Sequence, residues 1–229
     1  HTKLCVHAPA EVGVPYGTIP RILLIQITTE SKRSKSRDVY LGETMTDFLR
    51  NLGKRGSGGP GGSITHLKKQ SRKLFSSTIT ITSESGTGLE LENINFAQRA
   101  SMLWRPQESN TWSSHLTLSE SFYEDICQRA VPIDLRVIQA CSHYPLAIDI
   151  YCWLTYRNFT LKRPTYVSWK QLAMQFGSQY KHERHFKSAF LETLDRVKLF
   201  YPAAKYNHSS RGLQLLPSPT HIPRCDDMT

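Results

Sequence analysis

The amino-acid sequence predicts an α+β protein with two tandem winged-helix domains, each a helix-turn-helix followed by a β-hairpin wing. Helical periodicity changes to strict alternation at Thr78–Thr82. The order helix, strand, helix, turn, helix, hairpin then occurs again in the second half of the chain. A short apolar helix that ends in glycine also repeats, because Phe48-Leu49-x-x-Leu52-Gly53 matches Leu172-Ala173-x-x-Phe176-Gly177. A turn of this kind between two helices is typical of a helix-turn-helix.

The first domain is predicted at residues 1–118. Its expected helices are Gly17–Ser31, a short helix that starts with the capping signal at Thr44 and ends before Gly53, and Ser63–Ser76. Its expected strands are Asp38–Leu41, Thr78–Thr82, Leu89–Trp104 and Trp112–Leu118, with a turn at Ser83–Gly88 and a bulge near Glu92–Ile94. The glycine-rich stretch Gly53–Gly62 and residues Pro106–Thr111 are predicted loops.

The second domain is predicted at residues 119–217, followed by a flexible tail at 218–229. Its expected helices begin at Ser119 or Ser121, at Leu135, at Leu146, at the capping box Ser168-x-x-Gln171, and at Ser178. The helix Leu146–Phe159 is hydrophobic all round, which indicates burial at the centre of this domain. Tyr166–Val167 are expected to form a short strand, and Ala204–His208 and Leu213–Leu216 a hairpin.

The charge balance favours a polyanionic partner. The chain has 29 Lys and Arg against 19 Asp and Glu, a net charge of +10, and a pI near 9.5. Residues 1–118 and residues 119–229 both carry an excess of basic side chains, so the charge is not confined to one tail. Nucleic acid is the most common partner of such a protein, and the alternative is a basic protein without one.

Other classes of protein are disfavoured by the sequence. No apolar stretch approaches the roughly 20 residues of a bilayer-spanning helix. The five cysteines are odd in number and widely spaced, without a C-x-x-C motif, so they fit neither a zinc site nor a secreted disulfide framework. A reducing cytosol is the expected compartment.

The longer helix of each predicted helix-turn-helix carries the DNA-binding candidates. In both helices one face is apolar and the opposite face is basic, as expected for a helix that packs on a core and lies in the major groove. The alternative is an ordinary solvated face. The candidates on the two helices are Thr65, His66, Lys68, Lys69, Arg72 and Lys73, and then Lys181, His182, Arg184, His185, Lys187 and Ser188.

Five further DNA-binding candidates lie outside these helices. Arg211, at the predicted hairpin tip, is expected to reach a minor groove or a phosphate. Lys35 and Arg37, in a basic run after the first helix, and Lys162 and Arg163, after the central helix, are candidate phosphate contacts. Ordinary surface positions are the alternative for all five.

The sequence contains no convincing enzyme motif. The glycine-rich stretch Gly58–Gly62 is not followed by Gly-Lys-Ser/Thr, so it is not a P-loop. No Cys or acidic residue lies at a spacing that would make it a third metal ligand beside His182 and His185. No His-hydrophobe-His motif of an origin nickase is present. We therefore expect a non-enzymatic protein without a cofactor or a metal.

Several segments resemble a known family. They include Tyr16-Gly-Thr-Ile-Pro-Arg21, Gly62-Ser-Ile-Thr-His-Leu67, Pro145-Leu-Ala-Ile-Asp-Ile-Tyr-Cys-Trp-Leu-Thr-Tyr156, Val167-Ser-Trp169 and Leu216-Pro-Ser-Pro219. In this order and spacing they resemble the plasmid-encoded RepA replication initiators. The resemblance implies a bacterial, cytoplasmic protein that binds repeated duplex sites (iterons) at a plasmid origin. It also implies origin opening, recruitment of host proteins such as a replicative helicase or initiator, and a homodimer.

The Gly53–Gly62 insert departs from a tight helix-turn-helix. The first domain therefore acts in dimerisation, in DNA binding or in both, and the second domain carries base readout. Two other functions stay open. A winged-helix transcriptional repressor would use the same helices on a single palindrome rather than on direct repeats. An origin-nicking enzyme or primase is disfavoured by the missing metal motif.

Overall fold

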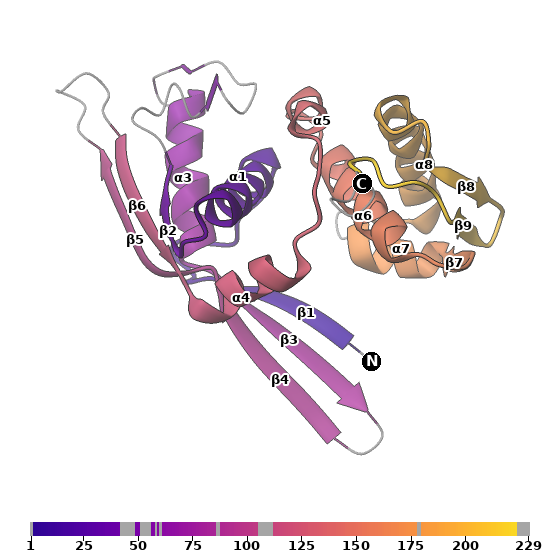
Figure 1. Ribbon diagram of the computed structural model, residues 1–229, viewed down its shortest axis with the longest axis horizontal. Helices are drawn as coiled ribbons and strands as arrows, with labels where there is room; N and C mark the ends of the chain where they lie inside the picture. Colours follow the sequence, from indigo (N-terminus) through magenta and orange to yellow (C-terminus); the bar gives the residue numbers. More distant parts are fainter. Residues whose placement is uncertain are drawn as a thin grey trace. The chain divides into compact units, whose positions relative to one another are not determined.

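The computed structural model describes residues 2–41, 49–50, 56–57, 59, 61–85, 88–104, 112–177 and 180–223. These residues form seven helices and nine strands (Figure 1). The mixed α+β class predicted from the sequence is confirmed. The chain divides into two compact units, His1–Ala130 and Val131–Thr229. The sequence predicts a domain boundary after Leu118, on the other side of helix α4 (Glu120–Arg129).

The elements defined by the described residues of the first unit are three helices and six strands. The helices are α1 (Thr18–Ser34), α3 (Ser63–Phe75) and α4 (Glu120–Arg129). The strands are β1 (Thr2–His7), β2 (Asp38–Tyr40), β3 (Thr78–Ser85), β4 (Gly88–Asn95), β5 (Ala97–Trp104) and β6 (Trp112–Leu118). They form two antiparallel sheets with the strand orders β1-β3-β4 and β2-β6-β5.

Helices α1 and α3 pack against each other in the core of the first unit. Leu23 and Ile27 of α1 and Leu67 and Leu74 of α3 are all buried, because they recur at helical spacing on one face of each helix. The predicted short helix before Gly53 lies largely outside the described residues, of which only Leu49 and Arg50 belong to it.

The single long strand predicted at Leu89–Trp104 is wrong. The chain leaves the β1-β3-β4 sheet after Asn95 and enters the β2-β6-β5 sheet at Ala97, where the register shifts between Ala97 and Arg99. Phe96, between the two strands, is buried and packs edge-on against Phe122 of α4, with ring centroids 5.3 Å apart. Burial of this ring redirects the chain, and the bulge predicted near Glu92–Ile94 is instead this change of sheet.

Two other strand predictions for the first unit need correction. The turn predicted at Ser83–Gly88 is shorter, since β3 continues to Ser85 and β4 already begins at Gly88. Strand β1 was not predicted, because it is stabilised by pairing with β3, more than seventy residues away (Thr2 opposite Ser83).

In the second unit, the part of the chain that the structure describes forms four helices and three strands. The helices are α5 (Leu135–Ala140), α6 (Pro145–Thr160), α7 (Trp169–Phe176) and α8 (Glu183–Phe200). The strands β7 (Thr165–Ser168), β8 (Lys205–His208) and β9 (Gly212–Leu216) form one antiparallel sheet in the order β7-β9-β8. The central helix α6 buries one face, which includes Ile150, Tyr151 and Leu154, whereas Tyr156 on the opposite face is 51% exposed. Its burial is therefore one-sided, and not all round as its hydrophobicity predicts.

Both ends of helix α7 follow the sequence prediction. Ser168 caps its start in a capping box with Gln171, and Gly177 ends it by donating its N–H to the Ala173 carbonyl at 2.8 Å. Helix α8 begins at Glu183, not at Ser178 as predicted. The backbone of the preceding residue, His182, is extended (φ −129°, ψ 133°) and forms the N-cap.

The two three-stranded sheets β2-β6-β5 and β7-β9-β8 share one connectivity. In the first unit β2 precedes α3 and pairs with β6, which is the last strand of its sheet along the chain. In the second unit β7 precedes α7 and α8 and pairs in the same way with β9. The difference lies in the first unit, where the β3–β4 pair is inserted between α3 and β5 and joins β1 in a separate sheet (Figure 1). The repeat seen in the sequence therefore corresponds to a repeated sheet topology.

Candidate nucleic-acid interface

The basic end of helix α8 is fixed by an aromatic core beneath it. Phe186 and Phe190 are fully buried, and their ring centroids lie 5.4 Å apart. Trp153 and Phe176 extend this cluster. Because the helix is held on this face, the side chains of Arg184, His185 and Ser188 are exposed on the other.

The start of α8 differs from the prediction in one respect. Lys181 and His182 are exposed but precede the helix, so they extend its basic end rather than lie along its face. The His182 and His185 rings meet edge to face with centroids 5.5 Å apart, and the Arg184 Nε donates to His185 Nε2 at 3.3 Å. No group of three His, Cys, Asp or Glu side chains within the described part of the chain could hold a metal ion.

The tip of the β8–β9 hairpin is tied to both helices beneath it. The Ser209 carbonyl accepts hydrogen bonds from Trp169 Nε1 at 3.0 Å and from Lys187 Nζ at 3.3 Å. The same ammonium lies 5.0 Å from the centre of the Trp169 ring. Lys187, a predicted DNA contact, thus points toward the hairpin. Arg211, at the tip, is exposed.

Trp169 is buried in the core of the second unit. Its indole N–H also anchors the hairpin tip, and its backbone N–H donates to the Arg211 carbonyl at 3.2 Å. The capping box that starts α7 at Trp169 is the sequence signal that could have located this residue at the start of a helix. Lys162 and Arg163 are exposed in the connection between α6 and β7.

In the first unit, helix α3 presents its basic side chains to a surface groove of about 590 Å³. Lys69 and Arg72 are exposed, while Lys68 and Lys73 are half-buried. The walls come from the segment before α1 and from β5. The groove is lined by Glu11, Val12, Thr65, Lys68, Lys69, Arg72, Lys73 and Ala100.

The sequence indicated the floor of this groove but not its walls, which are far from α3 in the chain. Two α3 side chains are already engaged by neighbouring backbone. Thr65 Oγ1 donates to the Gly59 carbonyl at 2.7 Å, and Lys73 Nζ donates to the Val14 carbonyl at 3.2 Å. His66 is exposed at the edge of the helix, against the Tyr16 ring.

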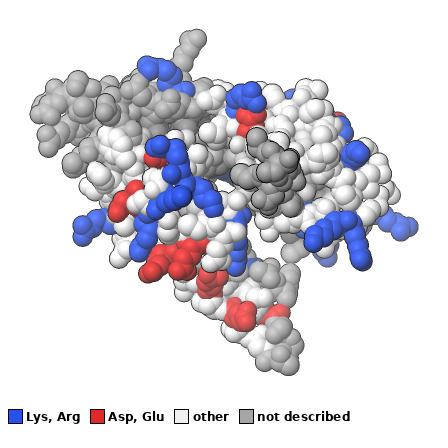
Figure 2. Space-filling model, viewed as in Figure 1, with Lys and Arg blue, Asp and Glu red and all other residues white. Residues whose placement is uncertain are grey.

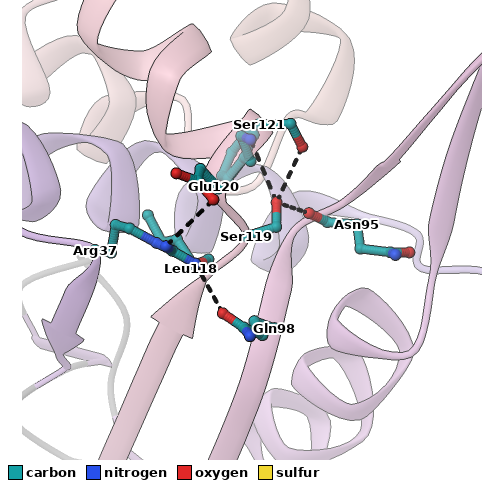
Figure 3. Close-up of polar contacts among 8 residues, drawn as sticks. Arg37, Asn95, Gln98, Leu118, Ser119, Glu120 and Ser121 are labelled. Carbon is teal, nitrogen blue, oxygen red and sulfur yellow. Dashed lines mark hydrogen bonds and ion pairs between the residues drawn. The ribbon is translucent and has the colours of Figure 1, made fainter.

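The two candidates of the first basic run have different surroundings. Lys35 is exposed and ends α1 in the left-handed conformation (φ 52°). The Arg37 guanidinium donates to the Leu118 carbonyl at 3.1 and 2.9 Å and to Gln98 Oε1 at 2.8 Å (Figure 3). It also lies 3.9 Å from Glu120. Arg37 therefore holds the junction of β6 and α4, where Ser119 caps the helix.

Charge is unevenly distributed over the first unit. Exposed glutamates lie along the β3–β4 pair at Glu84, Glu90 and Glu92. Figure 2 shows acidic side chains toward this part of the visible face and Lys and Arg side chains elsewhere on it. Among the described residues, no helix is long and apolar enough to cross a membrane.

Fold and site together define a class: a two-unit α+β protein in which each unit places a basic helix near a three-stranded sheet. The chain belongs to the plasmid encoded RepA protein family, whose model matches residues 14–171. This confirms the family resemblance of the sequence and supports a plasmid replication initiator. No curated protein matches the chain significantly.

Two solved structures share the fold over most of the chain. The crystal structure of RctB domains 2-3 (RctB-155-483) has a TM-score of 0.56 at 11% identity and covers 93% of this chain and 88% of that one. The SeMet derivative of RctB domains 2 and 3 has a TM-score of 0.58 at 12% identity, with coverages of 93% and 89%. At such low identity the similarity concerns the fold alone.

Proposed function

We propose that this chain is a plasmid replication initiator made of two winged-helix units, and that it binds iterons of duplex DNA at the plasmid origin through the second unit. The observation that carries the proposal is the arrangement in the second unit. The exposed basic start of α8 lies beside a hairpin whose tip is tied to α7 and α8 through Trp169 and Lys187. A recognition helix with its base-reading residues at the N-terminal end, flanked by a fixed wing, has this geometry.

In this proposal α8 enters the major groove, and Arg184, His185 and Ser188 reach base edges. Arg211 contacts the minor groove or a phosphate, and Lys162 and Arg163 contact phosphates on either side. The protein uses no cofactor or metal and has no catalytic step. Origin opening results from binding energy and distortion of the duplex. Pyrimidine–purine steps are the most easily distorted. Host replication proteins are then recruited in the bacterial cytoplasm.

The first unit takes part in a homodimer. The β1-β3-β4 sheet supports this role. Its two outer strands expose Leu4, Leu89 and Leu91 to between 59% and 62%. Exposed apolar side chains on edge strands favour pairing with another chain. The glutamates along β3 and β4 make this sheet an unsuitable surface for DNA.

Arg184→Ala tests base readout by α8. If the guanidinium reads a guanine, binding to the specific site weakens by about 1–3 kcal/mol and the preference at one base position is lost. Titration of labelled site variants at constant salt measures both effects. Equal losses on specific and random duplexes would assign Arg184 to a phosphate, and no loss on either would remove α8 from the interface.

A further inference from the structure

The groove over α3 has a second feature that duplex binding does not use. At its edge lies Tyr16, which is 49% exposed and stands four positions after the wall residue Val12 in the chain. The Lys73 ammonium lies 5.2 Å from the centre of its ring, and the ring of His66 meets it at 67° with centroids 6.1 Å apart. A cationic groove therefore continues into a pair of exposed aromatic rings.

The position of Tyr16 is fixed by backbone contacts. Its N–H donates to Oε1 of the fully buried Gln70 at 2.9 Å. On one side Gly17 starts α1 at a φ of +80°, a conformation that favours glycine. On the other side, Val12 and Gly13 both donate their N–H to the Pro9 carbonyl, at 2.9 and 2.8 Å. The groove wall and the ring beside it are thus one ordered segment.

The shape of the groove disfavours a duplex in this place. A helix that enters the major groove must stand clear of its surroundings, because the groove is only about 12 Å wide and the helix with its side chains nearly fills it. The cations of α3 instead line a depression bounded by Glu11 and Val12 on the segment before α1 and by Ala100 on β5. Its volume of about 590 Å³ is in the range of sites that enclose a small ligand.

The exposed aromatic rings favour single-stranded over duplex nucleic acid. In a duplex the faces of the bases are stacked on one another, so an aromatic side chain cannot reach them. An unpaired base offers its face, and stacking on an aromatic ring beside a cationic track is the usual mode of single-strand binding. A free nucleotide would offer the same chemistry, phosphate and an unstacked base, on a smaller scale.

We propose that the α3 groove binds single-stranded DNA, with phosphates on the α3 cations and an unstacked base on Tyr16 or His66. The inference rests on the proposed function, because origin opening is the step that would supply the single strand. It gives the first unit a role distinct from that of the second, which keeps the duplex readout through α8. The phosphate-binding side chains are Lys68, Lys69, Arg72 and Lys73.

Fluorescence anisotropy with a labelled oligo-dT of about 16 nucleotides, at about 0.15 M salt, tests the proposal on the full chain. We expect Tyr16→Ala to weaken oligo-dT binding by about tenfold, the scale of one lost base–aromatic stack, and Tyr16→Phe to leave it nearly unchanged. Tyr156→Ala removes an equally exposed tyrosine (51%) from α6 and should have no effect. Specific duplex binding of Tyr16→Ala should equal that of the wild type.

Several results would overturn the inference: no oligo-dT binding by the wild type, equal binding by wild type and Tyr16→Ala, equal losses on single strand and duplex, or displacement of the oligonucleotide by an equal concentration of ATP. Cross-linking of the wild type to oligonucleotides with 5-bromodeoxyuridine avoids variants altogether. Adducts are expected on Tyr16 or His66, and adducts confined to residues 131–229 would refute the site. If the wild type shows no sequence preference for any duplex, the proposed function fails instead.

Discussion

Two candidate interface side chains form hydrogen bonds within the protein. Lys187 and Arg37 were both predicted from the sequence to contact DNA. In the structure the Lys187 ammonium binds the hairpin tip at Ser209, and the Arg37 guanidinium binds the Leu118 carbonyl. The sequence could show that these residues are basic and near a helix. It could not show which carbonyl, distant in the chain, would accept their hydrogen bonds.

We expect Lys187→Met to loosen the hairpin rather than to remove a phosphate contact. The variant loses the hydrogen bond to Ser209 and the contact with the Trp169 ring, while its aliphatic stem still packs. Specific duplex affinity should fall several-fold, and amide exchange at residues 209–211 should quicken. The salt dependence of binding should not change. A slope smaller by about one unit would instead identify Lys187 as a phosphate contact.

A second residue-scale prediction concerns the buried hydroxyl of Tyr151. It accepts a hydrogen bond from the Asp134 N–H at 2.8 Å and shares one of 2.7 Å with His221 Nδ1. Burial raises the pKa of Tyr151 from 10 to about 12. The unfolded chain therefore loses this proton first, and the stability that the buried hydroxyl contributes is lost as the pH rises from 10 toward 12.

Urea unfolding at several pH values checks this prediction. Tyr151→Phe should weaken the alkaline decline and should cost about 1–3 kcal/mol at neutral pH, because two half-buried partners lose their hydrogen bond to the buried hydroxyl. Tyr156→Phe, at a half-exposed position, is the matched control. A Tyr151→Phe chain as stable as the wild type would show that this network contributes nothing. The network includes His221, in residues assigned to a flexible tail from the sequence.

At the scale of elements, the β7-β9-β8 sheet depends on one glycine. A Cβ at Gly212 would lie 2.3 Å from the Val167 carbonyl oxygen and 2.8 Å from the Ser168 Cα, which are backbone atoms of the paired strand. Gly212→Ala should therefore separate β9 from β7 and destabilise the second unit by about 1–3 kcal/mol. Gly88→Ala, where a Cβ meets nothing within 4 Å, is the control for thermal unfolding. Equal unfolding temperatures for the two variants would contradict the sheet as described.

Elements that depend on local signals were predictable. The capping box at Ser168, the glycine end of α7 and the central helix α6 follow from residues within a few positions of one another. Elements that depend on distant partners were not. The alternation through Leu89–Trp104 continues across a change of sheet, so periodicity alone could not reveal it. Likewise, the basic face of α3 was visible in the sequence, whereas the groove walls at Glu11 and Ala100 were not.

At the scale of the whole molecule, the two units share a sheet topology but differ in what surrounds the basic helix. In the second unit the start of α8 is exposed beside an anchored hairpin. In the first, α3 forms the floor of a groove, and an additional sheet exposes leucines and glutamates. The proposed division of work follows from this difference: duplex readout by the second unit, and single-strand binding and dimerisation by the first.

The central claim is that this chain recognises a particular duplex sequence. Selection of bound duplexes from a random pool at about 0.15 M salt, followed by sequencing, tests it most directly. We expect a sharp motif about one half-site long, because only the second unit reads the duplex, and we expect the plasmid origin to contain it as direct repeats. A single palindrome would favour a repressor. Salt-sensitive binding without any motif would contradict the claim.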